Sequence, residues 1–303
     1  GGVALNCVAN GKVLKEKIFE NIWIQPAAGD AGGSLGASLA YWHQELDRKR
    51  KISPDDDMKG SFLGPKFSCE TIEKELNLLK ANFNKYSEQK LLDILSKELS
   101  KEKTVGWFQG RMEFGPRALG CRSILADARS EKMQKELNLK VKFRESFRPF
   151  APSILIENVN DWFDLSYSSP YMLLVANVQK NIQVSMTSEQ EKLFGIQKLN
   201  IKRSKIPAVT HVDYSARIQT VHQNTNPRYY KLIKNFKEIT GCPILVNTSF
   251  NIRGEPIVCS IKDAFRCFMG TNLDILVLED FILYKSDQSE SLKEDYKNLF
   301  ELD

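Results

Sequence analysis

The sequence lacks the close cysteine and histidine spacings that mark metal or redox centres. Its six cysteines include no C-x-x-C pair, and its three histidines are too scattered to form a local metal motif. Cysteines at such spacings are typical of reduced thiols, so we expect a cytoplasmic protein.

Long apolar runs are missing as well. The stretch ILVLEDFILY is interrupted by charge well short of the roughly 18 residues that a membrane span needs, so no membrane partner is expected. The chain opens on GGVALNCVANGK, which has neither the basic start nor the apolar core of a signal peptide. It also lacks an initial Met, and we expect that further residues precede it in the protein.

What the sequence does contain is a globular composition with an uneven distribution of charge. Of its 303 residues, 42% are hydrophobic and 27% are charged, and the net charge is +5. Between residues 105 and 155 there are ten Lys and Arg and five Asp and Glu, and six of the ten are Arg. Because a guanidinium binds oxyanions with two donors at once, this stretch predicts a site for phosphate esters or nucleic acid.

Apolar periodicity and turn residues predict an α+β fold rather than a regular alternation of strands and helices. Helices are expected near 72–79, 91–99, 130–139, 227–240 and 260–270. Strands are expected at 104–109, 123–127, 151–157, 171–178, 208–214, 216–221, 243–249 and 274–285. Asn10-Gly11 predicts a hairpin between strands over 2–8 and 12–18, and Pro116 is expected to begin a short helix.

The densest motif is GWFQGRMEFGPRALGCRSILADAR, residues 106–129. Its regularly spaced glycines free backbone N–H groups to approach an anion, while Arg111, Arg117 and Arg122 supply charge. A turn-rich segment with surface arginines is the alternative interpretation. A second motif, VKFRESFRPFAPSIL, would place Lys142 and Arg144 on the same side of a strand.

Polar side chains of three other motifs are further candidates. In VNTSFNIRGEP, residues 246–256, amides and hydroxyls suit a phosphate or a small planar group, although they are also ordinary turn formers. In THVDYSARIQTV, His211 and Asp213 are candidates for proton transfer, with a structural role as the alternative. In GDAGGSLGAS, Asp30 suits either a metal-bound phosphate or a plain helix cap.

These blocks resemble the carbamoyltransferases of the nodulation-factor and antibiotic O-carbamoyltransferase type. GRMEFGPRALGCRSILAD, FRPFAP, THVDYSARIQTV and NTSFNIRGEPIV occur in that family's order. The resemblance implies a YrdC-like α/β domain over 67–285, with a mixed, largely antiparallel twisted sheet. Residues 1–47 are similar to the end of an actin/hexokinase-like domain, with 48–66 as a linker and 286–303 as a charged, loose tail.

The resemblance implies a two-step reaction. The YrdC-like domain would form carbamoyl-adenylate from ATP, with Mg²⁺, and carbamoyl phosphate. The other domain would transfer the carbamoyl group to a hydroxyl of a small-molecule or sugar acceptor. The family's upstream His-x-x-x-His pair is not in this sequence, so an iron-type divalent metal would retain only Asp30 as a ligand. We therefore expect only the first half-reaction from this chain.

In YrdC-like domains a Lys-x-Arg pair and a Ser-x-Asn pair surround the anion, which here match Lys142/Arg144 and Ser249/Asn251. The candidate catalytic residues are Lys142, Arg144, Arg148 and His211. Binding of ATP and carbamoyl phosphate is expected at Arg111, Glu113, Arg117, Arg122, Ser123, Asp213, Arg217, Asn247, Ser249, Asn251 and Arg253. Nucleotide contacts from the N-terminal remnant are expected at Gly1, Gly2, Asn6, Gly32 and Gly33.

Two other classes of function stay open. A basic RNA-binding module without catalysis would use the same positive blocks, but they carry no RNA-binding signature, so nucleic acid is not the expected partner. A folding or interaction unit without activity is the other alternative. The expected partners are small-molecule substrates, and a homodimer is left open.

Overall fold

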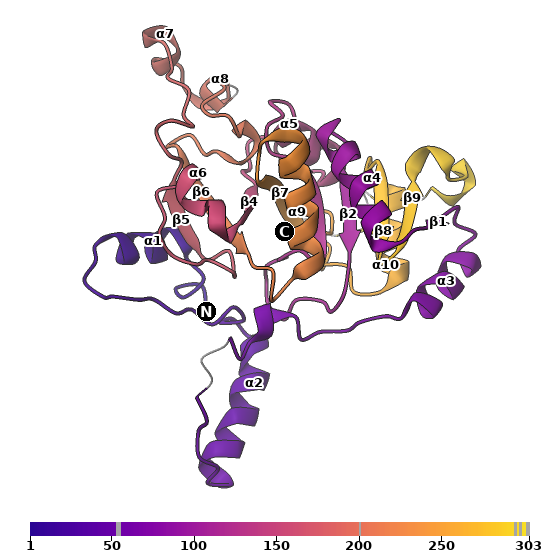
Figure 1. The fold of residues 1–303 in the computed structure, drawn as a ribbon, viewed down its shortest axis with the longest axis horizontal. Helices are drawn as coiled ribbons and strands as arrows, with labels where there is room; N and C mark the ends of the chain where they lie inside the picture. The colour runs from indigo at the N-terminus through magenta and orange to yellow at the C-terminus, as the bar shows by residue number, and fades with distance from the viewer. Residues whose placement is uncertain (53–55, 200, 294–295, 297–298, 301–303) are drawn as a thin grey trace.

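The computed structural model describes residues 1–52, 56–199, 201–293, 296 and 299–300. Within them a single mixed sheet forms the centre, with strand order β1-β9-β8-β2-β3-β7-β4-β6-β5 (Figure 1). The strands are β1 Asn84–Lys85, β2 Val105–Phe108, β3 Arg122–Asp127, β4 Ala151–Leu155, β5 Leu174–Asn177, β6 Ser215–Val221, β7 Ile244–Ser249, β8 Ile275–Leu278 and β9 Phe281–Tyr284. β2 runs parallel to β8 and β4 to β6, while the other neighbours are antiparallel. The expected mixed, largely antiparallel sheet is confirmed.

Helices cover this sheet because their apolar residues recur at helical spacing. They are α1 Cys7–Lys15, α2 Ala31–Ala40, α3 Cys69–Leu78, α4 Glu88–Ser100, α5 Met133–Glu136, α6 Val159–Trp162, α7 Ser188–Glu191, α8 Gly195–Leu199, α9 Pro227–Thr240 and α10 Ile261–Gly270. α4 and α9 lie side by side in front of the sheet in Figure 1, and α10 packs against β8 and β2. Among the described residues, no helix is both long enough and apolar enough to cross a membrane.

The sequence signals for α9 and α10 are confirmed at both ends. Pro227 is the first residue of α9, and Gly241 ends it with a φ of 72°, which a residue without Cβ adopts readily. The face predicted to be apolar, which includes Leu232 and Phe236, is buried. Ser260 caps α10, as predicted.

We expect Ser260→Ala to lower the free energy of unfolding by about 1 kcal/mol. The Ser260 hydroxyl accepts a hydrogen bond from the Asp263 N–H at 3.2 Å, and the Asp263 carboxylate accepts one from the Ser260 N–H at 2.8 Å. Urea unfolding of this variant beside Ser260→Thr, which retains the hydroxyl, checks the prediction. An equal loss in both variants would speak against the cap as the cause.

The N-terminal segment forms α1 where a hairpin was expected. Asn10 and Gly11 lie inside this helix instead of turning the chain. The Asn10 side chain donates to the Leu173 carbonyl at 3.2 Å, and a Cβ on Gly11 would lie only 2.3 Å from the Val175 oxygen. The hairpin prediction is wrong because these two residues pack α1 closely against the edge strand β5.

Two further predictions in the motif-bearing segments are wrong. Pro116 begins no helix, because the Glu113 carboxylate binds N–H groups of the following turn and fixes residues 113–121 as a loop. Lys142 and Arg144 do not share a strand, because Phe143 between them has a φ of 48°, which interrupts extended backbone.

The expected strand over 208–214 is also wrong. Pro207–Val209 forms a short 3₁₀ turn, and a bend follows it before β6 begins at Ser215. Pro207 and the polar residues within 208–214 favour turns over hydrogen-bonded pairing with a neighbouring strand.

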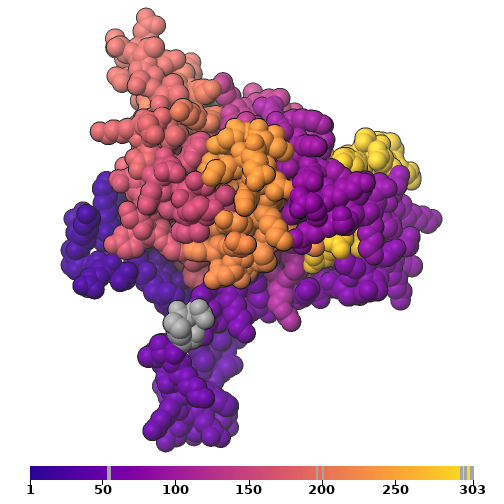
Figure 2. Space-filling model, in the orientation of Figure 1, coloured from indigo at the N-terminus to yellow at the C-terminus, as the bar shows by residue number. Residues whose placement is uncertain are grey.

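α2 stands away from the body of the molecule. Figures 1 and 2 show it projecting below the sheet, and none of its residues is buried. Asp30 precedes it at the cap position, but the Asp30 side chain makes no cap hydrogen bond. Asp30 therefore occupies the predicted cap position without making the hydrogen bond of a cap.

Candidate functional site

Four arginines from three separate segments surround a cavity of about 290 Å³, which we call the arginine cavity. Arg117 comes from the loop between β2 and β3, Arg144 and Arg148 from the loop before β4, and Arg217 from β6. The end of β7 supplies polar lining through Asn247, Thr248 and Ser249. Positive side chains from three segments that are distant in sequence therefore meet around one cavity.

Burial and mutual repulsion disfavour the charged forms of the arginines around this cavity. Burial, and then the neighbouring Arg148, lower the pKa of Arg144 to about 10. Burial, and then Arg117, lower the pKa of Arg217 to about 10. Among the described lining residues there is no Asp or Glu. An anion in the cavity would relieve the repulsion among these cations.

Two polar atoms of the lining are buried without a hydrogen-bond partner. They are Nε of Arg117, a donor, and Oδ1 of Asn247, an acceptor. The Asn247 amide nitrogen is already engaged, because it donates to the Ala118 carbonyl at 3.2 Å and to Gln219 Oε1 at 2.7 Å. Buried polar atoms in proteins are normally paired, so the lining residues have one donor and one acceptor with capacity for a further hydrogen bond.

The loop that carries Arg144 is held by a buried amide. Asn138 Nδ2 donates to the Ser146 carbonyl at 3.2 Å and to the Arg148 carbonyl at 2.8 Å, while its Oδ1 accepts from Arg144 Nε at 2.7 Å. The Arg144 guanidinium also lies 5.2 Å from the centre of the Phe150 ring. These contacts hold the Arg144 side chain in one position. The site is therefore formed before a ligand binds.

Lys142 lies behind the cavity wall. Its ammonium donates to Ser249 Oγ at 3.2 Å, to Asn251 Oδ1 at 2.8 Å and to the Asn251 carbonyl at 2.9 Å, with a further short contact to the Ser249 carbonyl. We call these three residues the lysine clamp. Burial, and then Arg144, lower the pKa of Lys142 to about 7. The predicted Lys-x-Arg and Ser-x-Asn pairs therefore meet, but only Arg144 and Ser249 line the cavity.

Glu113 lies in the β2–β3 loop, and Arg122 and Ser123 are the first two residues of β3; none of the three lines the arginine cavity. The Glu113 carboxylate accepts from the Leu119 N–H at 2.7 Å and from the Cys121 N–H at 2.8 Å. Ser123 Oγ accepts from the backbone of Gly120 at 3.0 Å. These residues were expected to contact ligand, and the structure instead places them where they shape the loop that presents Arg117.

Arg122 is fully buried. Its side chain is 0% exposed, and its guanidinium lies 3.5 Å from the centre of the Phe108 ring. It donates to backbone carbonyls of Gln109 at 2.9 Å and Cys121 at 3.0 Å, which are the two ends of the loop. A planar group with five donors can tie several carbonyls together, so Arg122 closes the loop from within.

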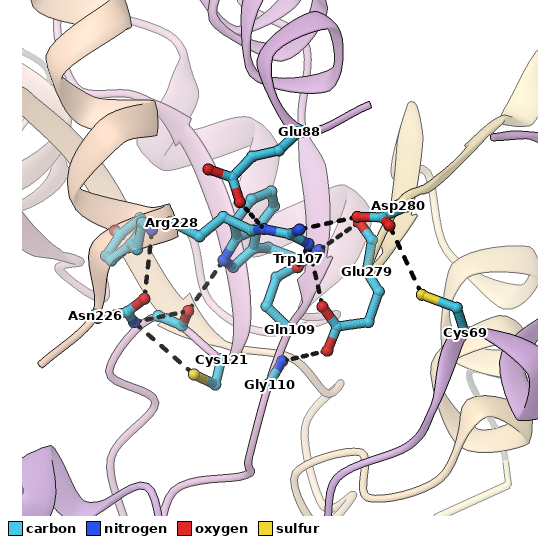
Figure 3. Close-up of polar contacts among 12 residues, drawn as sticks. Cys69, Glu88, Trp107, Gln109, Gly110, Cys121, Asn226, Arg228, Glu279 and Asp280 are labelled. Carbon is cyan, nitrogen blue, oxygen red and sulfur yellow. Dashed lines mark hydrogen bonds and ion pairs between the residues drawn. The ribbon is translucent and has the colours of Figure 1, made fainter. Parts of the chain in front are cut away.

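Arg228, which belongs to no sequence motif described above, fixes the start of the same loop from α9. It is the second residue of α9 and donates to Gln109 Oε1 at 2.8 Å, Glu279 Oε2 at 3.1 Å, Asp280 Oδ1 at 2.8 Å and Glu88 Oε2 at 3.2 Å (Figure 3). Glu279 in turn accepts from the Gly110 N–H at 2.6 Å. No feature of the local sequence around Arg228 indicates that three distant segments converge on it.

The remaining candidates in the larger domain lie outside the cavity. Arg111 is exposed and donates to the Gly64 carbonyl at 3.1 Å. Arg253 Nη1 donates to Glu145 Oε1 at 3.4 Å, and Glu145 also pairs with Arg148 at 3.0 Å. Arg253 is thus linked to the cavity through Glu145 and does not line it.

His211 and Asp213 form a group of their own with Ser215. His211 Nδ1 lies 3.0 Å from Ser215 Oγ, which donates to Asp213 Oδ1 at 2.6 Å. Burial lowers the pKa of His211, so its neutral form is favoured. Neither His211 nor Asp213 lines the arginine cavity; Asp213 lines a separate cavity of about 560 Å³ beside α1.

The N-terminal candidates do not assemble a metal centre. Asp30 is exposed, and no group of three or more His, Cys, Asp or Glu that could hold an ion gathers within the described ranges. Asn6 caps α1 by accepting from the Ala9 N–H at 3.1 Å. A divalent metal therefore does not fit the residues that are present, and we derive no chemical step from it.

The glycines expected to contact nucleotide near the N-terminus lie at two places. The Gly1 amino group donates to the Ala28 carbonyl at 2.5 Å, and a Cβ on Gly32 would lie 2.0 Å from the Ala27 oxygen. Gly2 and Gly33 have open space around them. Gly32 is thus required for local packing, and the nucleotide role of these residues stays a prediction.

Comparisons with known proteins match the whole chain. Residues 96–285 match the family model described as carbamoyltransferase C-terminus, and residues 1–39 match the carbamoyltransferase N-terminus model. An uncharacterized protein from Synechocystis sp. is 57% identical over 306 residues, and the match covers 100% of this chain and 50% of the relative.

Two relatives carry functional names. Nodulation protein NolO from Bradyrhizobium diazoefficiens is 40% identical, with 95% of this chain and 49% of the relative covered. The 3'-hydroxymethylcephem-O-carbamoyltransferase from Streptomyces clavuligerus is 29% identical, with 92% of this chain and 47% of the relative covered. The chain thus spans about half the length of the curated relatives it matches.

A solved structure, full-length HypF in the phosphate- and nucleotide-bound form, is also similar. Its TM-score is 0.41 at 16% sequence identity, and the match covers 67% of this chain and 22% of that chain.

Proposed function

The chain belongs to the carbamoyltransferase family, and from this premise we propose that its arginine cavity binds carbamoyl phosphate beside ATP and forms carbamoyl-adenylate. The observation that carries the proposal is the meeting of four arginines from three segments around one cavity, whose lining residues also hold two unpartnered polar atoms, Arg117 Nε and Asn247 Oδ1. Carbamoyl phosphate combines a phosphate, which accepts hydrogen bonds, with a carbamoyl NH₂, which donates them. One small molecule would therefore satisfy both atoms.

The reaction balances with one water. Water cleaves carbamoyl phosphate to carbamate and phosphate. A carbamate oxygen then bonds to the α-phosphorus of ATP, the bond from that phosphorus to pyrophosphate breaks, and carbamoyl-adenylate and pyrophosphate result. Both steps shift negative charge among phosphate oxygens, so fixed cations accelerate them by positioning and by neutralising charge. A cavity lined by four arginines supports this kind of catalysis better than nucleophilic catalysis.

Individual residues would divide this work. Arg144 and Arg217 bind phosphate oxygens, Arg117 Nε donates to the reacting group, and Asn247 Oδ1 orients the carbamoyl nitrogen. Arg148 lies at the rim, where its ion pair with Glu145 at 3.0 Å leaves it able to exchange partners. Mg²⁺ would enter with ATP as its counterion.

The acceptor in the second half-reaction would be a hydroxyl compound. One relative is named for carbamoyl transfer to the oxygen of a hydroxymethylcephem, and the family is shared. In this proposal the chain carries out the first half-reaction. The six free cysteines are compatible with a cytoplasmic setting.

The test measures pyrophosphate release on adding ATP, Mg²⁺ and carbamoyl phosphate to the chain. We expect release that depends on all three, and adenylate trapped as a new nucleotide species. A folded protein that binds ATP and carbamoyl phosphate without releasing pyrophosphate would overturn the chemistry. Salt-sensitive RNA binding that ATP does not displace would favour the RNA-binding alternative instead.

A further inference from the structure

Tyr296 is buried although it lies in the tail that the sequence predicts to be loose. Its side chain is 2% exposed, and its ring lies 5.6 Å from the Phe300 ring in an edge-to-face arrangement. The family model that covers the larger domain ends at residue 285, so Tyr296 lies outside the matched region. At Tyr296 itself the structure shows packing where the sequence predicts a loose tail.

The Tyr296 hydroxyl contacts the loop after β7 through Glu255. It donates to Glu255 Oε1 in a short hydrogen bond, and Glu255 itself is 8% exposed. Glu255 Oε2 accepts from the Ile252 N–H at 2.8 Å, and the Glu255 carbonyl accepts from Asn251 Nδ2 at 2.6 Å. Both contacts fix the chain between Asn251 and Glu255.

The same contacts continue to the cavity wall. Asn251 Oδ1 accepts from Lys142 Nζ at 2.8 Å and from Ser249 Oγ at 2.7 Å, and Ser249 lines the arginine cavity. A continuous series of hydrogen bonds therefore joins Tyr296 in the tail to the residue that would face the ligand. Fully satisfied buried networks of this kind restrict side chains to one arrangement.

α10 is shaped to receive Tyr296. Its last residue is Gly270, and a Cβ there would lie 2.1 Å from the Tyr296 Cβ. Any larger residue at 270 would push the tyrosine out of its place, because real Cβ atoms do not approach so closely. The fit of Tyr296 against Gly270 is an observation independent of the hydrogen bonds.

We propose that Tyr296 and Glu255 are positioning residues which brace the lysine clamp from behind and fix the surroundings of Lys142, so that the contact made by Tyr296 sets the affinity of the arginine cavity for phosphate. The effect on affinity rests on the proposed function, whereas the effect on Lys142 does not. The brace touches neither ligand nor reacting atoms.

The electrostatics agree with the geometry. The charged and titratable groups that face Lys142 are Arg144, which lowers its pKa, and Glu255 and Cys267, which raise it. Burial raises the pKa of Glu255, and the hydrogen bond from Tyr296 opposes this rise. Loss of the Tyr296 hydroxyl would thus favour protonated Glu255, which removes a negative charge that supports the charge of Lys142.

The first arm of the test measures the titration of Lys142 without ligand. The carbon next to the ammonium is followed by NMR in lysine-labelled protein and assigned by its loss in Lys142→Arg. In Tyr296→Phe and Glu255→Gln we expect its pKa to fall by about one unit below that of the parent. Tyr230→Phe is the matched control, because Tyr230 donates to Glu157 at 2.6 Å far from the clamp. An unchanged Lys142 titration in both brace variants overturns the inference.

The second arm measures binding of inorganic phosphate against pH. Lys142 is charged below its pKa of about 7, so parent affinity should fall as pH rises through that value. In the brace variants the fall should come at a lower pH, with affinity at pH 7 reduced about fivefold because the charged fraction of Lys142 falls by that factor. Gly270→Ala, which displaces the Tyr296 ring, should give the same shift.

The outcomes separate the two proposals. If the Lys142 pKa is lower in the brace variants than in the parent, but the parent binds no phosphate, the result supports the brace and counts against the proposed function. Phosphate binding with the same pH midpoint in parent and brace variants overturns the brace and leaves the proposed function standing. A loss of stability alone would move neither midpoint.

Discussion

Replacing Arg117 with alanine is expected to weaken the binding of carbamoyl phosphate about 100-fold without lowering the free energy of unfolding. Nε of Arg117 is buried without a partner, and Arg117 contributes to the lowered pKa of Arg217. Its removal relieves repulsion in the ligand-free protein but deletes a charged donor from the complex. Binding and stability should therefore change independently, as in sites where charge is retained for a ligand.

Calorimetric titration and urea unfolding on the same samples check this prediction. Lys140→Ala is the charge-matched control, because Lys140 is exposed and pairs only with Glu136 among the ion pairs found, at 3.2 Å. The control should bind as the parent does. If Arg117→Ala loses several kcal/mol of stability, or binds as tightly as the control, the interpretation of Arg117 as a ligand residue is wrong.

Replacing Arg122 with leucine should give the opposite result, a loss of about 3 to 5 kcal/mol in the free energy of unfolding. Its guanidinium is buried and donates to backbone carbonyls at both ends of the β2–β3 loop. Leucine would leave those carbonyls and the Glu113 carboxylate without their compensating charge. Arg111→Ala, in the same motif but exposed, should change stability by about 0.5 kcal/mol or less.

Chemical unfolding of the two variants side by side gives the comparison. Arg111 and Arg122 are eleven residues apart in one motif, yet we expect only Arg122 to be structural. A stable Arg122→Leu protein that has lost phosphate binding would restore the original expectation that Arg122 contacts the ligand.

Sequence patterns predicted the elements whose signals are local. The ends of α9 and α10 follow from Pro227, Gly241 and the Ser260 cap, each of which acts within a few residues. The strands β2, β3, β7, β8 and β9 follow from short apolar runs between turn residues. The hairpin at Asn10-Gly11 failed because its turn signal competes with tertiary packing against β5, which no local pattern contains.

The candidate site was predicted in part for a similar reason. Arginines grouped in sequence indicate an anion site, and Arg117, Arg144, Arg148 and Arg217 do line one cavity. Residue type does not distinguish a guanidinium that binds ligand from one that binds carbonyls, so Arg122 was assigned with the rest. The two kinds of arginine differ in where the side chain is buried, and this can be known only from the folded structure.

Residues that act on the site from a distance were beyond the reach of motifs. Arg228 holds the start of the β2–β3 loop from α9, and Tyr296 contacts the lysine clamp through Glu255. The hydrogen-bond partners of Arg228 and Tyr296 are all more than 40 positions away in sequence. The smallest separation, 41 residues, is that between Tyr296 and Glu255. Hydrogen bonds across such separations follow from topology and not from spacing.

The most direct measurement is a crystal structure of the chain with carbamoyl phosphate. We expect the phosphate to lie among Arg117, Arg144 and Arg217, with the carbamoyl nitrogen about 3 Å from Asn247 Oδ1. A ligand seated elsewhere, with Arg117 Nε and Asn247 Oδ1 still unpartnered, would contradict it.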